Sequence, residues 1–105
     1  MNEYQPSHLL SSGALELDTE ACTLLINHQE VHITPIEYAI MRLLLQHPGR
    51  VFSRQDIIAS CWPEDAWVAE RTVDVNIGRL RRKLGESGSR ISSRIGFGYM
   101  LVPLT

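Results

Sequence analysis

The chain has 105 residues and a formal net charge of −2, with 44% hydrophobic and 21% charged residues. This length and composition indicate one globular domain with a modest core, and they exclude a disordered tail or two independent domains. The longest apolar run is interrupted by Arg42 and is too short to span a bilayer. The first ten residues lack the basic region and long apolar core of a signal peptide, so we expect a cytoplasmic protein without a membrane partner.

Charge is distributed unevenly along the chain. Residues 1–67 hold three basic and nine acidic side chains, a net of −6, whereas residues 68–105 hold seven basic and three acidic ones, a net of +4. Such asymmetry is typical of a domain that presents one face to an anionic partner. The acidic total favours the alternative, a solvated basic helix with no ligand, and charge alone leaves both open.

The N-terminal third has a strand pattern. Residues 1–8 are polar and are expected to be a linker or a trimmed boundary, so the folded domain is predicted over residues 9–105. From residue 9 to residue 33, apolar residues alternate with polar ones, and segments 18–20 and 27–29 suit turns. We therefore predict a small antiparallel meander with one buried face. Its inward residues are Leu15, Leu17, Cys22, Leu24, Ile26, Val31 and Ile33.

Two helices follow, and both have clear start signals. Thr34 and Glu37 form a capping box with Pro35 at the first helical position, and residues 47–49 stop this helix. Ser53 and Asp56 form a second cap of the same kind, and the second helix ends at residues 62–63. Cys22 and Cys61 have no zinc-ligand spacing, so we expect both to be reduced and buried.

A third helix is predicted over residues 70–84. Val73, Ile77, Leu80 and Leu84 recur at steps of four, three and four, which indicates a buried stripe. A different face carries Arg71, Val75, Arg79 and Arg82. This helix is therefore amphipathic with a basic outer side, and Gly85 is its natural stop.

The chain closes with a predicted hairpin over residues 90–102 around a glycine-rich tip. The order is thus sheet, three helices and hairpin, an α+β winged helix-turn-helix. In that arrangement the third helix enters the major groove of DNA, and the hairpin, or wing, contacts the backbone or the minor groove.

The residues also resemble a known family, the DNA-binding effector domains of OmpR/PhoB-type response regulators. The matching motifs are ITPIEYAIMRLLLQHPGRVFSRQDIIASCW at 33–62, ERTVDVNIGRLRRKL at 70–84 and GFGYML at 96–101. The resemblance implies a four-stranded N-terminal sheet, three helices and a C-terminal wing. It also implies an N-terminal receiver domain, which is absent from this chain.

The resemblance implies which residues of this chain contact DNA and RNA polymerase. It places Arg71, Thr72, Val75, Asn76 and Arg79 at groove-facing positions of the helix, and Arg81 and Arg82 near phosphate contacts. Ser53 and Arg54 match a backbone-contacting position at a helix start, and Arg90, Arg94 and Gly96 belong to the wing. The loop at residues 63–69 matches a segment that touches RNA polymerase in some members. The polymerase-contact candidates are Glu64, Asp65, Trp67 and Glu70.

Two departures from the family pattern bear on these expectations. Gly78 stands where the family often has a basic residue, which removes one possible phosphate contact and costs about 1 kcal/mol of helix propensity. In the wing the usual Thr-Val-Arg-Gly is replaced by Ser-Arg-Ile-Gly at residues 93–96, so the arginine has moved by one residue. A one-residue move in a strand reverses the direction of Arg94 unless a bulge restores it.

Other residues have less distinctive roles. We expect Asp74 to pair with Arg71 or Arg81, and Trp62 to lie in the core, while Trp67 suits either packing or a polymerase-facing surface. The four histidines are scattered, and no catalytic or metal-binding spacing is present. We therefore expect no enzyme, no metal and no cofactor.

The sequence thus predicts sequence-specific binding of double-stranded DNA by a bacterial transcription regulator. The resemblance suggests direct-repeat half-sites, occupied by a domain that is a monomer alone and a dimer on DNA. The alternative is a winged helix kept as a protein–protein module that contacts polymerase or another partner, with weak or no DNA binding. The net charge, Gly78 and the displaced wing arginine favour this alternative.

Overall fold

The computed structural model describes residues 8–104, so residues 1–7 of the predicted linker lie outside the described part of the chain. Its elements, in chain order, are β1 (Leu9–Ser12), β2 (Leu15–Asp18), β3 (Thr23–Ile26), β4 (Gln29–Val31), α1 (Pro35–Gln46), α2 (Arg54–Cys61), α3 (Glu70–Leu84), a 3-10 helix η1 (Gly85–Arg90), β5 (Ile91–Arg94) and β6 (Gly98–Leu101). The predicted order of sheet, three helices and hairpin is confirmed.

The four N-terminal strands form an antiparallel sheet in the order β1-β2-β3-β4. Its register pairs Leu17 with Leu24, and the inward side chains of both residues and of Leu15 are fully buried. Asn27 and His28 have φ of 51° and 67° and close the β3–β4 hairpin. A two-residue turn with positive φ at both positions matches the twist of the strands that it joins.

Two sequence-based expectations for this region are wrong. The strand pattern extends too far, since β4 ends at Val31 and Thr34 already caps α1; Ile33 lies between them, although it does pack against the core as expected. Cys22 is exposed in the turn between β2 and β3, where its φ is 55°, so it is not a buried core residue.

The first two helices begin at the predicted capping boxes. Thr34 Oγ1 accepts a hydrogen bond from the Glu37 N–H at 3.1 Å, and Glu37 Oε1 accepts one from the Thr34 N–H at 2.8 Å. Ser53 and Asp56 repeat this exchange at 3.0 and 3.1 Å. The boxes differ in burial, since Asp56 is exposed whereas Glu37 is 1% exposed and accepts a hydrogen bond from Lys83 Nζ of α3 at 2.6 Å.

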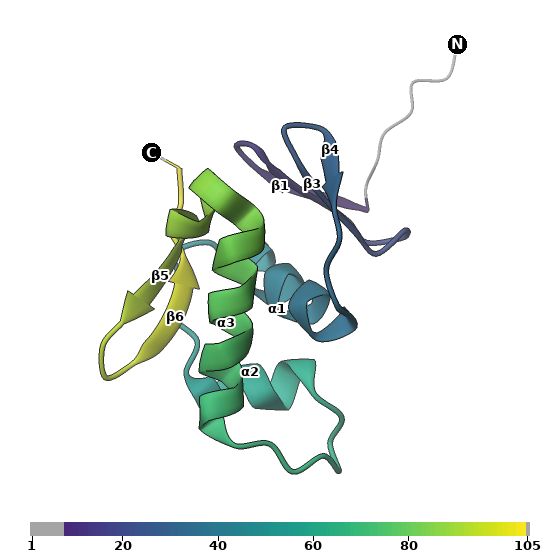
Figure 1. Cartoon of the computed structure of the whole chain (residues 1–105). Helices are drawn as coiled ribbons and strands as arrows, with labels where there is room; N and C mark the ends of the chain where they lie inside the picture. The colour runs from purple at the N-terminus through teal and green to yellow at the C-terminus, as the bar shows by residue number, and fades with distance from the viewer. Residues whose placement is uncertain (1–7, 105) are drawn as a thin grey trace.

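The core lies where the three helices meet the inner face of the sheet. The predicted stripe of α3 is confirmed, because Val73, Ile77, Leu80 and Leu84 are all buried. Figure 1 shows α3 along the front of the molecule, with α1 behind it, α2 at its lower end and the sheet at the top of the view. The outer side of α3 is left uncovered by this arrangement.

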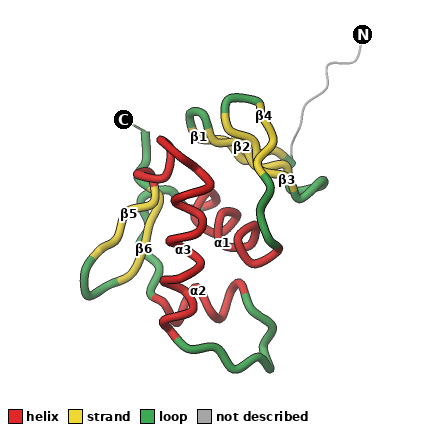
Figure 2. The backbone as a smooth tube through the Cα atoms, viewed as in Figure 1, coloured by secondary structure: helices red, strands yellow, loops and turns green. Residues whose placement is uncertain are grey.

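The C-terminal hairpin lies beside α3 (Figure 2) and is joined to the segment before α2. Phe52 and Tyr99 exchange backbone hydrogen bonds, from Phe52 N to Tyr99 O at 2.8 Å and from Tyr99 N to Phe52 O at 2.9 Å. Gly98 adopts φ 143° directly against this contact, and a Cβ there would overlap the Phe52 carbonyl oxygen. The hairpin is therefore fixed to the helices at its C-terminal strand.

Candidate nucleic-acid interface

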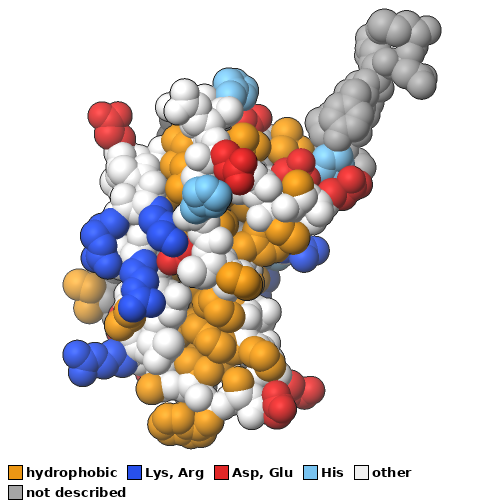
Figure 3. All heavy atoms as spheres, turned by 45° about the vertical axis from the view of Figure 1, so that its right-hand side comes forward, with side chains coloured by type: hydrophobic (Ala, Val, Ile, Leu, Met, Phe, Trp, Pro, Cys, Tyr) orange, Lys and Arg blue, Asp and Glu red, His pale blue; other side chains and the backbone are white. Residues whose placement is uncertain are grey.

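The exposed side of α3 carries most of the predicted groove-facing residues. Arg71, Thr72, Val75 and Arg79 are exposed, and so is Arg82 near the C-terminal end of the helix. None of the three arginines is paired with a carboxylate of residues 8–104. Figure 3 shows Lys and Arg side chains gathered at one edge of the molecule, with hydrophobic side chains between them. This side of α3 thus offers unpaired guanidinium groups to an anionic partner.

Asn76 does not share this exposed side. Its side chain is buried, and its Nδ2 donates a hydrogen bond to the carbonyl oxygen of Thr72 at 2.9 Å. The groove-facing position expected for Asn76 is therefore corrected: the amide is turned back onto its own helix.

Two further basic residues of α3 are held by partners within the protein. Arg81 Nε and Nη2 donate to the carbonyl oxygen of Ile91 at 3.1 and 2.8 Å, and Nη2 also donates to Ser93 Oγ at 2.9 Å. Lys83 is bound to Glu37 at 2.6 Å. The expected location of Arg81 near phosphate is thus replaced by a contact that joins α3 to β5. The basic residues of α3 therefore fall into two groups. Arg71, Arg79 and Arg82 are exposed without a carboxylate partner in the described part of the chain, whereas Arg81 and Lys83 hold other elements of the fold.

Asp74 joins three elements. Its Oδ1 accepts from Arg54 Nε of α2 at 2.8 Å and from the Tyr99 hydroxyl of β6 at 2.5 Å. The hydrogen bond from Arg54 holds the pKa of the Asp74 carboxyl below its usual value, against the effect of burial and with help from Tyr99. Asp74 is an ion-pair partner as expected, but its partner is Arg54 and not Arg71 or Arg81.

The tyrosine ring in this cluster also contacts two cations. The guanidinium carbon of Arg54 lies 5.9 Å from the Tyr99 ring centroid, and that of Arg81 lies 5.6 Å from it. Guanidinium groups within about 6 Å of an aromatic ring are attracted to its face. We name Arg54, Asp74, Arg81 and Tyr99 the wing anchor, because they fix the hairpin to α2 and α3.

The start of α2 lies beside the wing. Ser53 caps the helix through its Oγ, and Arg54 lines an open hollow of about 260 Å³ together with Arg94 and Gly96 of the wing. Ser53 lines a neighbouring hollow that also includes Arg54 and Gly96. The structure thus brings the predicted backbone-contacting residues, Ser53 and Arg54, next to the predicted wing residues, Arg94 and Gly96. Arg54 reaches this place while it is paired with Asp74.

The wing itself is regular. Ser93 pairs with Tyr99 and Arg94 with Gly98, without a bulge. Arg94 is exposed and, by alternation, lies on the face opposite to Ser93, which contacts Arg81. The bulge that would restore the usual direction of the wing arginine is therefore absent from β5.

Arg90 lies outside the wing, at the end of η1. Its guanidinium donates to the carbonyl oxygen of Val102 at 2.9 and 3.0 Å and to the carbonyl oxygen and hydroxyl of Ser12 at 3.1 and 2.6 Å. The expected wing role of Arg90 is corrected by these contacts, which tie the C-terminal segment to β1. The sequence holds no local signal for them, because Ser12 is 78 residues away.

The loop at residues 63–69 is separate from the wing. Trp67 is 91% exposed, which excludes the packing role that the sequence left open. Glu64, Asp65 and Glu70 are exposed as well, whereas Trp62 is partly buried against the core. Glu64, Asp65 and Trp67 therefore form an accessible acidic and aromatic surface on the loop, whereas Glu70, at the start of α3, lines a hollow with Gly96 and Phe97 of the wing.

Two other kinds of site are not found among residues 8–104. No group of three or more histidine, cysteine or acidic side chains is placed to hold a metal ion in that part of the chain. Within it, no helix is both long and apolar enough to pass through a bilayer.

Comparison with known proteins gives a consistent result. Residues 28–101 match the family model described as "Transcriptional regulatory protein, C terminal". The chain is 41% identical over 97 residues to the phosphate regulon transcriptional regulatory protein PhoB of Rhizobium meliloti, a match that covers 90% of this chain and 43% of that protein. The chain therefore spans less than half the length of this relative.

Solved structures of the same shape include two isolated domains. The DNA-binding domain of the response regulator AdeR, solved in complex with an intercistronic region, matches with a TM-score of 0.79 and 31% identity over 90% of this chain and 99% of that one. The DNA-binding domain of CpxR from E. coli matches with a TM-score of 0.82 and 27% identity, over 94% of this chain and 100% of that one.

Proposed function

Because this chain belongs to the family of C-terminal domains of transcriptional regulatory proteins, of the OmpR/PhoB type, we propose that it binds double-stranded DNA in a sequence-specific manner. The observation that carries this proposal is the side of α3 with exposed, unpaired Arg71, Arg79 and Arg82. The similar AdeR domain was solved with DNA, which supports this function over a protein–protein module. The family comprises transcriptional regulators and not enzymes.

Different residues of α3 contact different parts of the DNA in this proposal. Arg71 and Arg79 offer forked donors that suit guanine edges or phosphates, and Thr72 and the 43% exposed Val75 suit thymine methyl groups. Arg82 lies a further turn along the helix and suits a phosphate. Asn76 reads no base in this proposal, because its amide is bound to Thr72.

A second group of residues supports the helix. Ser53 and Arg54 meet the DNA backbone from the start of α2, and Arg94 and Gly96 meet it from the wing. Arg81 and Arg90 act indirectly, since their guanidinium groups hold β5 and β1 in place.

The whole regulator extends beyond this chain. We place the chain as the effector domain of a cytoplasmic two-component regulator whose receiver domain lies outside it; the domain is monomeric alone and dimeric on direct-repeat half-sites. The exposed residues Glu64, Asp65, Trp67 and Glu70 form the surface for RNA polymerase. We assign the folded domain to residues 9–105 and residues 1–8 to a linker or a trimmed boundary.

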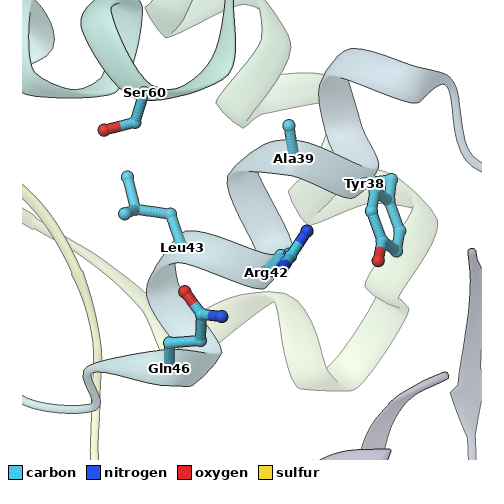
Figure 4. A pocket seen from close by; sticks show the side chains of 6 residues that line it. All are labelled: Tyr38, Ala39, Arg42, Leu43, Gln46 and Ser60. Carbon is cyan, nitrogen blue, oxygen red and sulfur yellow. The ribbon is translucent and has the colours of Figure 1, made fainter. Parts of the chain in front are cut away.

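The test is selection of duplexes from a random library, followed by fluorescence anisotropy at several salt concentrations. Arg79→Ala should weaken binding and lower the salt slope by about 1, because one phosphate or base contact is lost. Arg42→Ala is the matched control: Arg42 is an exposed arginine that lines a hollow of about 250 Å³ formed only by α1 and α2 (Figure 4). Equal effects of the two variants, or no selected sequence, would contradict the proposal.

A further inference from the structure

The tip of the wing is unusually apolar for an exposed turn. Ile95 is 95% exposed and Phe97 is 75% exposed, with Gly96 between them. Among residues 8–104 only Trp67, in the separate loop, is a large apolar side chain of comparable exposure. Adjacent bulky apolar side chains on a protruding turn are typical of a contact surface.

This tip is held in place on both sides. Within the turn, the Phe97 N–H donates to the Arg94 carbonyl oxygen at 2.8 Å. On the N-terminal side Ser93 is bound to Arg81, and on the C-terminal side Tyr99 is bound to Asp74. Both partners belong to α3, so a ligand that binds α3 meets the tip at a fixed place and little conformational freedom is lost there.

The charges around the tip distinguish its two apolar side chains. Ile95 shares a hollow of about 260 Å³ with Arg54 and Arg94. Phe97 lines a neighbouring hollow of about 230 Å³ that also includes Arg54, but there the carboxylate of Glu70 takes the place of Arg94. An apolar side chain with arginines and no carboxylate beside it suits a partner that combines an apolar recess with negatively charged walls, and Ile95 has this setting.

We propose that Ile95 enters the minor groove of DNA next to the major groove that α3 occupies, with Arg94 directed at the adjacent phosphates. The minor groove is about 6 Å wide, is walled by phosphates and accepts apolar side chains that lie against sugars and base edges. The amino group of guanine projects into that groove, so this contact favours A·T steps. The inference rests on the proposed function and names the wing as an apolar, sequence-selective contact.

The experiment compares Ile95→Ala, Phe97→Ala and Arg79→Ala on one selected duplex that holds a single domain. Ile95→Ala removes three side-chain carbons. With half of their surface covered by DNA, their loss should weaken binding about tenfold. It should leave the salt slope unchanged, because an apolar contact releases no counterions. Phe97→Ala is the matched control at the same turn and should have a smaller effect. Thermal unfolding should be the same for both variants and the original chain, since neither side chain belongs to the core.

A second measurement locates the contact in the minor groove. Inosine in place of guanine under the wing removes the minor-groove amino group and leaves the major-groove pattern unchanged. Binding of the original chain should strengthen on this change, and binding of Ile95→Ala should strengthen less. Equal responses would overturn the minor-groove assignment.

The remaining outcomes separate the inference from the proposed function. Unchanged binding by Ile95→Ala, together with weakened binding by Arg79→Ala, would overturn the inference and retain DNA recognition. A loss seen only on duplexes that hold two domains would assign the tip to a second copy of the chain and would also overturn it. If the original chain binds no duplex, the proposed function fails, and the inference fails with it.

Discussion

The ion pair between Glu37 and Lys83 gives an asymmetric stability prediction. The carboxylate is 1% exposed, whereas the lysine side chain is 35% exposed. Lys83→Met keeps the aliphatic stem but leaves a buried carboxylate whose hydrogen bonding then depends on Thr34. Loss of one partner of a buried pair lowers the free energy of unfolding by about 3 to 5 kcal/mol, so we expect about 3 kcal/mol here because the hydrogen bonding from Thr34 remains.

Glu37→Gln should cost less, about 1 kcal/mol. The amide oxygen can still accept from the Thr34 N–H, and Lys83 is exposed enough to turn its ammonium group towards water, where it is solvated. Lys83→Met should therefore destabilise the protein more than Glu37→Gln, because it leaves the buried charge unpaired rather than the exposed one. The double variant should recover part of the loss in Lys83→Met, since no uncompensated charge then remains inside.

The pH dependence provides an independent check. Burial raises the pKa of Glu37, but the hydrogen bonds from Lys83 and Thr34 outweigh burial and hold it below the usual value. In the original chain this carboxylate therefore stabilises the fold above its unfolded-state pKa, and the contribution is lost as pH falls through the folded-state pKa. Without Lys83 the effect of burial prevails and the folded-state pKa rises, so the stability gap between the two proteins should narrow from pH 7 towards pH 4.

The assay is urea unfolding followed by circular dichroism at both pH values. At pH 7 the midpoint temperature of Lys83→Met should also fall by roughly 15 °C, at about 4 to 8 °C per kcal/mol for a domain of this size. Equal decreases in the free energy of unfolding for Glu37→Gln and Lys83→Met would refute the argument from burial. A stability difference between Lys83→Met and the original chain that does not change with pH would refute it as well.

Three further predictions concern other parts of the fold. Gly98→Ala should cost more than 3 kcal/mol by urea unfolding, because its Cβ would overlap a backbone carbonyl, whereas Gly78→Ala should stabilise by about 1 kcal/mol, since its Cβ meets only an arginine nitrogen at 3.8 Å. Tyr99→Phe should lower the free energy of unfolding by about 1 kcal/mol and weaken DNA binding, because the hydroxyl anchors the wing that carries Arg94; unchanged binding would show that the hydroxyl is not needed to position the wing. In a thiol-labelling assay at pH 8, Cys22 should react first, because it is exposed, while burial raises the pKa of Cys61 to about 11; simultaneous labelling would contradict this.

Local patterns in the sequence determined the elements of this protein. The capping boxes at Thr34 and Ser53, the alternation in residues 9–31 and the stripe in residues 70–84 all concern neighbours within one or two turns. Short-range hydrogen bonds and periodic burial decide such features, so the order of elements and the bounds of α3 were predictable.

The tertiary structure decided which polar groups remain free to bind a partner. Asn76 is turned back onto its own helix, and Arg81 and Lys83, in the same basic helix as Arg79, are bound by a carbonyl oxygen 10 residues away and a carboxylate 46 residues away. Charge and periodicity do not distinguish these groups, because a buried polar group takes its partner from whatever element packs against it. The exposed arginines of α3 and the apolar wing tip are what this packing leaves uncovered.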